Sequence, residues 1–93
     1  MLIPNNTLIN PDGSIAPFEP HQHGSRLETW QTLLNGYFEP VPIPGSSSQI
    51  ALVDEEGLLK RSRDELNTTA SLLLGMPILG PALIVETEDL DRD

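Results

Sequence analysis

Prolines and glycines divide this chain into short pieces, and that division limits the fold more than any other feature. The 93 residues contain nine prolines and seven glycines, many of which separate apolar stretches. Proline lacks the backbone donor that a helix or a strand ladder needs, and glycine adopts the left-handed conformations of turns and helix ends. We therefore interpret the chain as a series of short strands and helices joined by turns.

The first 24 residues contain a predicted β-hairpin, or a strand followed by a turn. Residues 7–9 and 14–16 are the two arms, and Asn10-Pro11-Asp12-Gly13 lies between them. Pro-Asp-Gly favours a turn because proline presets φ and glycine accepts the left-handed position. Pro17 and Pro20 then end the pairing, since neither can donate to a ladder.

A helix is predicted over residues 26–35. Ser25 and Glu28 match a capping box, in which each side chain accepts from the other residue's backbone amide. Apolar residues follow at helical spacing and form one stripe: Leu27, Trp30, Leu33 and Leu34. Asn35-Gly36 ends the helix, and we expect Gly36 to take the left-handed cap.

The middle of the chain is predicted as an edge strand followed by a second hairpin. Prolines alternate through residues 37–44, which favours an edge strand or a polyproline-like segment. A flexible serine loop at 46–48 follows. Residues 49–53 and 58–61 then bracket Asp54-Glu55-Glu56-Gly57. Apolar arms around a short loop that ends in glycine predict a hairpin.

A second helix and a closing strand are predicted in the last third. Ser62 and Asn67 can each cap a helix, so the helix begins at 63 or at 68. It ends at Gly75, shortly before Pro77. Residues 82–85 are apolar without alternation, which is typical of a strand at the centre of a sheet.

This order of elements predicts an α+β fold. We expect a small antiparallel or mixed sheet of four to five short strands, with two helices packed on one face. A single domain covers residues 1–85 and includes the proline-rich segment 1–24. Residues 86–93 carry five acids and one arginine, and we expect them to form a disordered acidic tail.

The chain is strongly acidic, with fourteen acidic residues against five basic ones and a net charge of −9. Such a field repels nucleic acid and anionic membranes and makes a basic partner plausible. There are no cysteines, which excludes disulfides and thiolate chemistry. The chain has no apolar run of roughly 20 residues, and its start lacks a basic segment before an apolar one. We therefore expect a cytoplasmic protein.

No set of residues predicts catalysis or a cofactor. Asp54-Glu55-Glu56 lies on a turn expected to be exposed, where nothing buries one carboxylate to prepare it for acid–base work. Ser46-Ser47-Ser48 has no base nearby in the sequence, and no glycine-rich nucleotide motif is present. His21 and His23 could start a metal site with Glu19, but a solvated loop explains them better. We expect no enzyme, no cofactor and no metal site.

One basic cluster stands out in this acidic chain: Lys60, Arg61 and Arg63. Guanidinium groups pair with phosphate in bidentate geometry, and Asn67 at a helix N-terminus would add donors. The cluster is therefore a candidate site for a small anionic ligand. The favoured alternative is local pairing with the nearby carboxylates, which outnumber the bases: Asp54, Glu55, Asp64 and Glu65.

Four motifs occur in a characteristic order: Gly36-Tyr37-Phe38-Glu39, Asp54-Glu55-Glu56-Gly57, Leu66-Asn67 and the apolar segment 78–85. In this order they resemble the small phage- and plasmid-borne family known as domain of unknown function 3846. The likeness covers about residues 27–85, and the chain departs from the family pattern at 61–65 and in the segment through His23. The resemblance implies an α+β fold, a mobile-element or viral origin and a place in the host cell cytoplasm. It transfers no catalytic residues.

Three functions follow as hypotheses. The first is a non-enzymatic phage or mobile-element accessory protein, an antagonist of host defence that binds a signalling nucleotide or a host protein. The second is an acidic decoy that imitates nucleic acid and occupies a nucleic-acid-binding protein. The third is a structural module without a ligand that forms a homodimer or a higher homo-oligomer, since apolar surface near Trp30 and Tyr37 could close such an interface.

Overall fold

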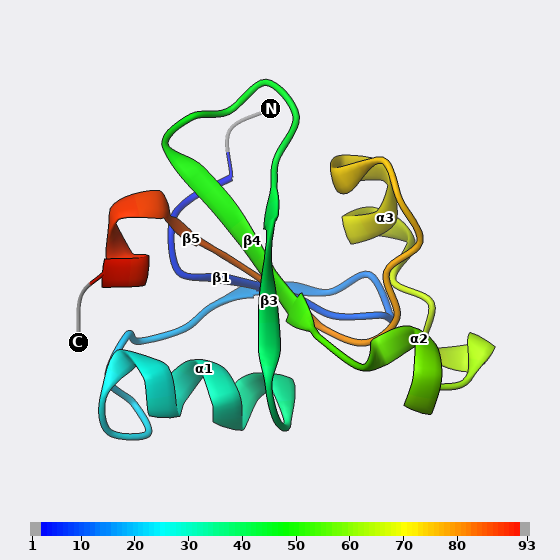
Figure 1. Cartoon of the computed structure of the whole chain (residues 1–93), viewed down its shortest axis with the longest axis horizontal. Coiled ribbons are helices and arrows are strands. Elements are labelled where there is room, and N and C mark those ends of the chain that lie inside the picture. The colour runs from blue at the N-terminus through cyan, green and yellow to red at the C-terminus, as the bar shows by residue number, and fades with distance from the viewer. Residues whose placement is uncertain (1–2, 92–93) are drawn as a thin grey trace.

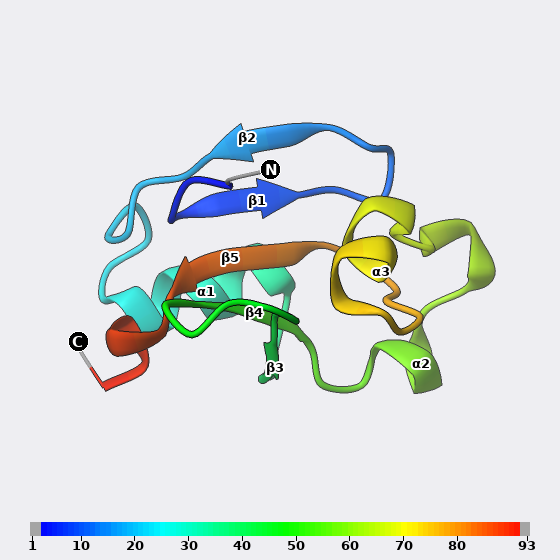
Figure 2. The same cartoon turned by 90° about the horizontal axis from the view of Figure 1, so that it is seen from above.

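A five-stranded antiparallel sheet forms the centre of the computed structural model, which describes residues 3–91 (Figure 1). Its strands lie in the order β2-β1-β5-β4-β3, and Figure 2 shows β2, β1, β5 and β4 side by side. The strands are β1 (Thr7–Ile9), β2 (Ile15–Pro17), β3 (Phe38–Pro42), β4 (Gln49–Asp54) and β5 (Ala82–Glu86). The helices are α1 (Arg26–Leu34), α2 (Gly57–Lys60) and α3 (Thr68–Leu74). The expected α+β fold is confirmed.

Strand β5 lies between β1 and β4, as the unbroken apolar run at its start predicts. Successive side chains of a strand point to opposite faces of the sheet. Ala82 and Ile84 therefore enter one core cluster, while Leu83 and Val85 enter the other. All four are fully buried, so the centre of the sheet has no solvated face.

The helices α1 and α3 cover opposite faces of the sheet (Figure 1). Trp30 and Leu34 of α1 pack in the cluster of Leu83, whereas Ala70 and Leu74 of α3 pack in the other cluster. The expectation that both helices lie on one face is therefore wrong. Because β5 is apolar on both sides, each face of the sheet needs a helix to exclude water.

Helix α1 begins with the predicted capping box. The Ser25 hydroxyl accepts from the Glu28 amide, and the Glu28 carboxylate accepts from the Ser25 amide, both at 3.1 Å. At the other end Asn35 takes the left-handed conformation, with φ of 60°. The expectation that Gly36 would do so is corrected, since asparagine also tolerates this region.

Helix α3 begins at the second of the two predicted positions. The Asn67 side chain accepts from the Ala70 amide at 3.1 Å and caps the helix. Residues Arg63–Glu65 form a separate 3-10 turn, in which the Ser62 amide donates to the Glu65 carboxylate at 3.3 Å.

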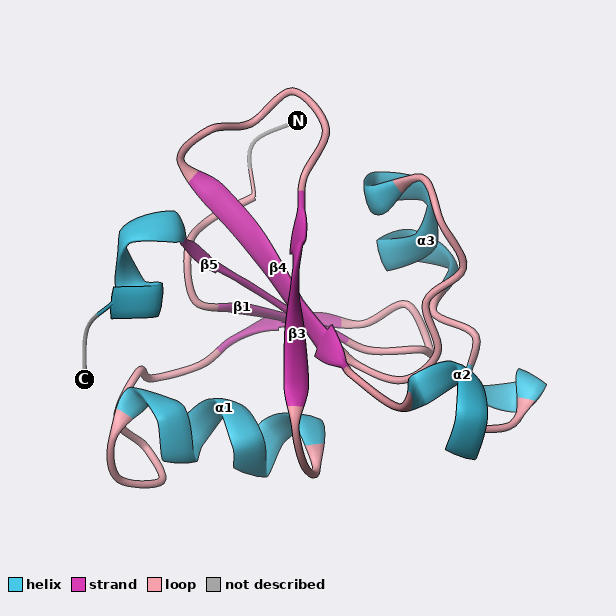
Figure 3. Ribbon diagram, in the orientation of Figure 1, coloured by secondary structure: helices cyan, strands magenta, loops and turns pink. Residues whose placement is uncertain are grey.

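The segment after β4 is helical, so the expected hairpin between 49–53 and 58–61 is wrong (Figure 3). Both edges of β4 are occupied by β3 and β5, which leaves no ladder for residues 58–61 to join. The Asp54 carboxylate accepts from the Glu56 amide at 2.9 Å and turns the chain into α2.

The acidic end of the chain is ordered as far as the structure describes it. Glu86 is the last residue of β5, and Thr87–Asp91 form a 3-10 helix. Leu90 packs against the core cluster that contains Trp30, and Asp89 is buried. The expectation of a disordered tail is wrong for 86–91, because Leu90 anchors the segment to the core. Residues 92 and 93 lie outside the described part.

Prolines occupy outward-facing positions of edge strand β3. The Tyr37 carbonyl accepts from the Glu55 amide at 3.2 Å. Every second residue from 37 onwards therefore directs its backbone hydrogen bonds to β4. The backbone nitrogens of Pro40 and Pro42 therefore point to the free edge of β3, and neither carries a hydrogen that could be donated there. The free edge of β3 consequently lacks two of the donors that an added strand would use.

Edge strand β2 is protected in the same way at one position, Pro17. The Phe18 amide donates to Asn6 and the Asn10 amide donates to Ser14, at 2.9 Å each. By the same alternation the backbone nitrogens of Ile15 and Pro17 point away from β1.

Within residues 3–91 no helix is long and apolar enough to cross a membrane.

Restoring donors to β3 should permit pairing of sheet edges between molecules. We expect the double variant Pro40→Thr with Pro42→Thr to self-associate as its concentration rises, whereas the unmodified chain does so less. Sedimentation velocity over a hundredfold concentration range measures this, with Pro20→Thr and Pro44→Thr, both outside the strands, as the matched control. Equal behaviour of the two double variants would contradict the prediction.

Candidate functional site

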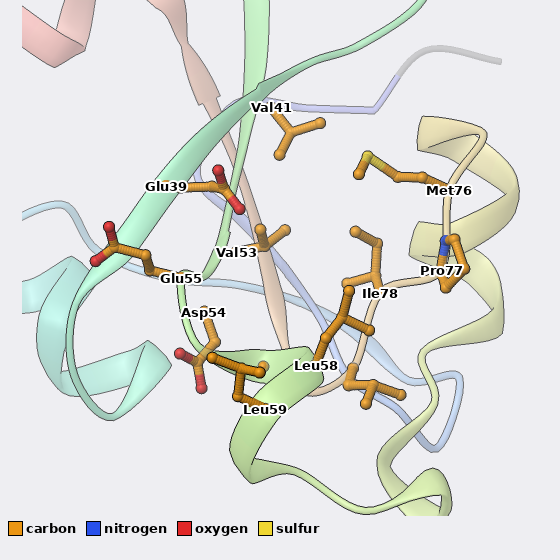
Figure 4. Close-up of a pocket in the computed structure, with 12 residues that line it drawn as sticks. Glu39, Val41, Val53, Asp54, Glu55, Leu58, Leu59, Met76, Pro77 and Ile78 are labelled. Atoms are coloured by element: carbon orange, nitrogen blue, oxygen red, sulfur yellow. The ribbon is translucent and has the colours of Figure 1, made fainter.

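An apolar cavity of about 280 Å³ opens between the sheet, α2 and the segment 76–79 (Figure 4). Strands β3 and β4, helix α2 and that segment each contribute to its wall: Val41, Val53, Leu58, Leu59, Met76 and Ile78. Four segments thus meet here, and the last of them is distant in the sequence from the other three. We call this the first cavity.

A second cavity of about 430 Å³ shares part of its wall with the first. The two share Leu58, Pro77 and Leu79, and the second adds Leu66 and Arg63. We call the two cavities with their shared wall the apolar groove.

The groove leaves large apolar side chains in water. Leu58 is 68% exposed and Leu59 is 89% exposed, although both lie on the short helix α2. Met76 and Leu66 are each more than two-fifths exposed. Single exposed apolar residues are ordinary, but a contiguous set beside a cavity is typical of an interaction surface.

The two ends of the groove carry opposite charges. Glu39 and Glu55 line the first cavity and are exposed (Figure 4). Arg63 lines the second cavity and is also exposed. Within residues 3–91 none of these three side chains has a hydrogen bond or an ion pair. Their charges are therefore available to a bound molecule.

The basic cluster predicted from the sequence is largely neutralised by its own neighbours. Arg61 donates from Nε to the Asp54 carboxylate and from Nη1 to the Glu65 carboxylate, at 2.7 Å each. Its Nη2 donates to the Leu34 carbonyl at 3.2 Å. Lys60 Nζ lies 3.4 Å from the same Asp54 carboxylate. The alternative of local pairing thus describes Lys60 and Arg61.

Asn67 is a structural residue and not part of an anion site. Its side chain is fully buried. The amide nitrogen donates to the carbonyls of Ile9 at 2.9 Å and of Gly80 at 3.0 Å, while its oxygen caps α3. Of the four predicted ligand-binding residues, the structure leaves only Arg63 exposed and without a partner in the described part.

The pKa of Asp54 reflects a balance of opposing effects. Burial of this carboxyl, whose side chain is 1% exposed, acts to raise its pKa. Hydrogen bonds from Arg61, from the Glu56 amide and from Lys60 outweigh burial, so the pKa lies below its ordinary value. Burial likewise acts to lower the pKa of Arg61, but Asp54 and Glu65 raise it.

Gly80 gives Arg61 the room to reach Asp54. A Cβ at position 80 would lie 2.7 Å from Arg61 Nε and 2.8 Å from its Cδ and Cζ. Gly80 also has φ of +89°, which side chains with a Cβ rarely adopt. Glycine is therefore favoured at position 80 for two reasons. Its backbone accepts the positive φ, and the missing Cβ leaves room for the guanidinium of Arg61.

The histidines and serines have local roles. His21 Nδ1 lies 3.2 Å from the Gly24 carbonyl in an exposed turn, and His23 donates its amide to Thr29. The Ser46 hydroxyl accepts from the Gln49 amide at 3.2 Å. Among the residues that the structure describes, no three His, Asp or Glu side chains are grouped to hold a metal.

Sequence reasoning missed the apolar groove. The sequence predicts that Leu58 and Leu59 belong to a hairpin arm and that Met76 lies in the connection after the second helix. The available signals were two adjacent leucines in a polar stretch and a methionine directly after the helix stop at Gly75. Neither signal says that the two segments meet.

Asp54→Asn should destabilise the chain, because Arg61 and Lys60 lose the carboxylate that pairs with them. We expect a loss of about 3 kcal/mol at pH 7, typical of removing one partner of a buried ion pair. The pKa of Asp54 is lowered on folding. Its contribution is therefore complete above the ordinary pKa of about 4 and disappears as the pH falls through the folded-state pKa.

Urea unfolding between pH 7 and pH 2 checks this expectation. The unmodified chain should lose more stability in acid than Asp54→Asn, so the two curves converge as the pH falls. The exposed residue Asp64 supplies the control Asp64→Asn, which removes the same charge. Parallel curves for the unmodified chain and Asp54→Asn would show that the pair contributes nothing.

Gly80→Ala should cost more than a left-handed backbone alone explains. Gly13 is the matched control, since its φ is +91° and nothing lies within 4 Å of an added Cβ. We expect about 1 kcal/mol for Gly13→Ala from backbone strain, and about 3 kcal/mol for Gly80→Ala because Arg61 is also displaced. Equal losses in thermal unfolding would mean that Arg61 moves aside without cost.

Comparisons of the chain with protein-family models, with curated proteins and with solved structures gave no match. The resemblance to the phage- and plasmid-borne family stays a prediction. The site is therefore interpreted from its geometry alone.

Proposed function

We propose that this chain is a non-enzymatic protein-binding module, and that the apolar groove takes an apolar and basic segment of its partner. The observation that carries the proposal is the exposure of Leu58 and Leu59 beside a cavity. The free carboxylates of Glu39 and Glu55 lie at the same cavity and supply the preference for a basic segment.

Burial of the exposed leucines would supply much of the binding free energy. Fully burying one leucine side chain is worth about 1.5–3 kcal/mol. Leu58, Leu59 and Met76 lie together around the first cavity, as an anchor pocket requires. A partner that fills the cavity would cover all three.

Charge favours a basic partner over a second copy of the chain. Each copy has a net charge of −9, so two copies repel one another at long range. A basic segment is attracted by the same field, and the free carboxylates at the rim of the groove would fix its position.

The nucleotide hypothesis has less support than the protein-binding one. Lys60 and Arg61 are occupied by Asp54 and Glu65, and Asn67 is buried. The acidic decoy does not need an apolar groove, and its proposed tail includes the buried Asp89. Binding to a host protein, as part of a mobile element's action against host defence, remains a prediction compatible with the groove.

A peptide-display selection tests the proposal. Random 16-residue peptides are selected against the unmodified chain and, in parallel, against Leu59→Asp, which places a charge in the groove wall. We expect the unmodified chain to enrich peptides with leucine-like residues and a positive net charge. Leu72→Asp is the matched control, because Leu72 is 80% exposed but lines neither cavity.

Two outcomes would contradict the proposal. One is identical enrichment by the unmodified chain and Leu59→Asp, which would place the binding surface elsewhere. The other is self-association at micromolar concentration that Leu59→Asp abolishes, which would assign the groove to a second copy of the chain.

A further inference from the structure

The apolar groove is electrically polarised along its length. Its first cavity carries the free carboxylates of Glu39 and Glu55, and its second cavity carries the free guanidinium of Arg63. Leu58, Pro77 and Leu79 belong to both cavities and lie between the two ends. A molecule that spans the groove therefore meets negative charge at one end and positive charge at the other.

We propose that the groove binds an amphipathic helix in one direction only. The N-terminal end of that helix lies at Glu39 and Glu55, and its C-terminal end lies at Arg63. The proposal rests on the protein-binding function above and adds the conformation, the charge pattern and the orientation of the bound segment.

A helix suits this surface better than a strand. The free edge of β3 presents Pro40 and Pro42 outward, so a peptide added there would find few backbone donors. Two cavities that share a wall can each take an apolar side chain from one face of a helix, where residues three or four apart are neighbours. Leu58, between the cavities, would lie between those two side chains.

The direction follows from charge. A helix carries about half a positive charge at its N-terminus and half a negative charge at its C-terminus. With the N-terminus at Glu39 and Glu55, both helix ends face groups of opposite sign. A lysine in the first turn and a glutamate in the last would strengthen the same orientation, and the reverse orientation would place like charges together.

Arg63 can take this role because its neighbours are engaged elsewhere. Arg61 also lines the second cavity, but it is bound to Asp54 and Glu65. Asp64 carries the nearest opposite charge in the sequence, yet it lines neither cavity. Arg63 is therefore the cation that a bound helix would meet.

Two synthetic peptides test the direction. Both are hydrocarbon-stapled, have blocked termini and share one composition and one leucine stripe. One carries lysines in its first turn and glutamates in its last, and the other carries the reverse. Stapling equalises their helicity, which charge placement would otherwise change. We expect the first to bind about tenfold more tightly in fluorescence anisotropy, because the second can pair its charges only by reversing on the groove, which places both ends of its helix dipole against like charges.

Variants of the groove assign that preference to its ends. Glu39→Lys with Glu55→Lys should abolish it, and adding Arg63→Glu should invert it. Glu19→Lys with Asp91→Lys changes the net charge equally at exposed sites outside the groove and should leave it intact.

The outcomes separate this inference from the proposed function. Equal affinity of the two peptides for the unmodified chain, lost in Leu59→Asp, would overturn the direction while the groove remains a binding site. Binding of neither peptide would overturn both proposals. A preference that survives all charge reversals of the groove would show that the helix does not lie between Glu39 and Arg63.

Discussion

The ion pair between Arg61 and Asp54 holds together the part of the molecule on which the candidate site depends. Arg61 joins the end of β4, through Asp54, to the turn that contains Glu65 and to the last carbonyls of α1 at Leu34. It lies against Gly80, just before the central strand. Helix α2 is only one turn long and cannot be stable on its own. Its position beside the sheet thus depends on contacts at its two ends.

Much of the fold could be predicted because its signals are local. Ser25 and Glu28 lie three residues apart, so the capping box and the helix it starts are visible in the sequence. The alternating prolines of β3 likewise exclude a central strand without reference to any other segment. The side of the sheet to which each helix packs is not local. The unbroken apolar run of β5 indicates that both faces of the sheet need cover, but it does not say which helix covers which face.

The candidate site was harder to predict because tertiary contacts create it. Whether a cation is free or paired depends on where the carboxylates lie in space, and Asp54 is seven residues from Arg61 in the sequence. From the sequence, Asn67 is expected to be an exposed helix cap. In the structure its side chain is buried and donates to the carbonyls of Ile9 and Gly80. The groove combines β3, α2 and the segment 76–79, three segments whose proximity no local pattern records.

The loss of the basic cluster and the formation of the groove are two results of one arrangement. Arg61 and Lys60 pair with Asp54 at the end of β4, and in the same short segment Leu58 and Leu59 are exposed beside the first cavity. Both cations therefore already have a carboxylate partner, while two leucines of the same segment lie in water. The exposed parts of these two leucines add no burial free energy to the isolated chain. Exposed leucines beside a cavity, and not the basic cluster, are therefore the feature on which the proposed protein-binding function rests.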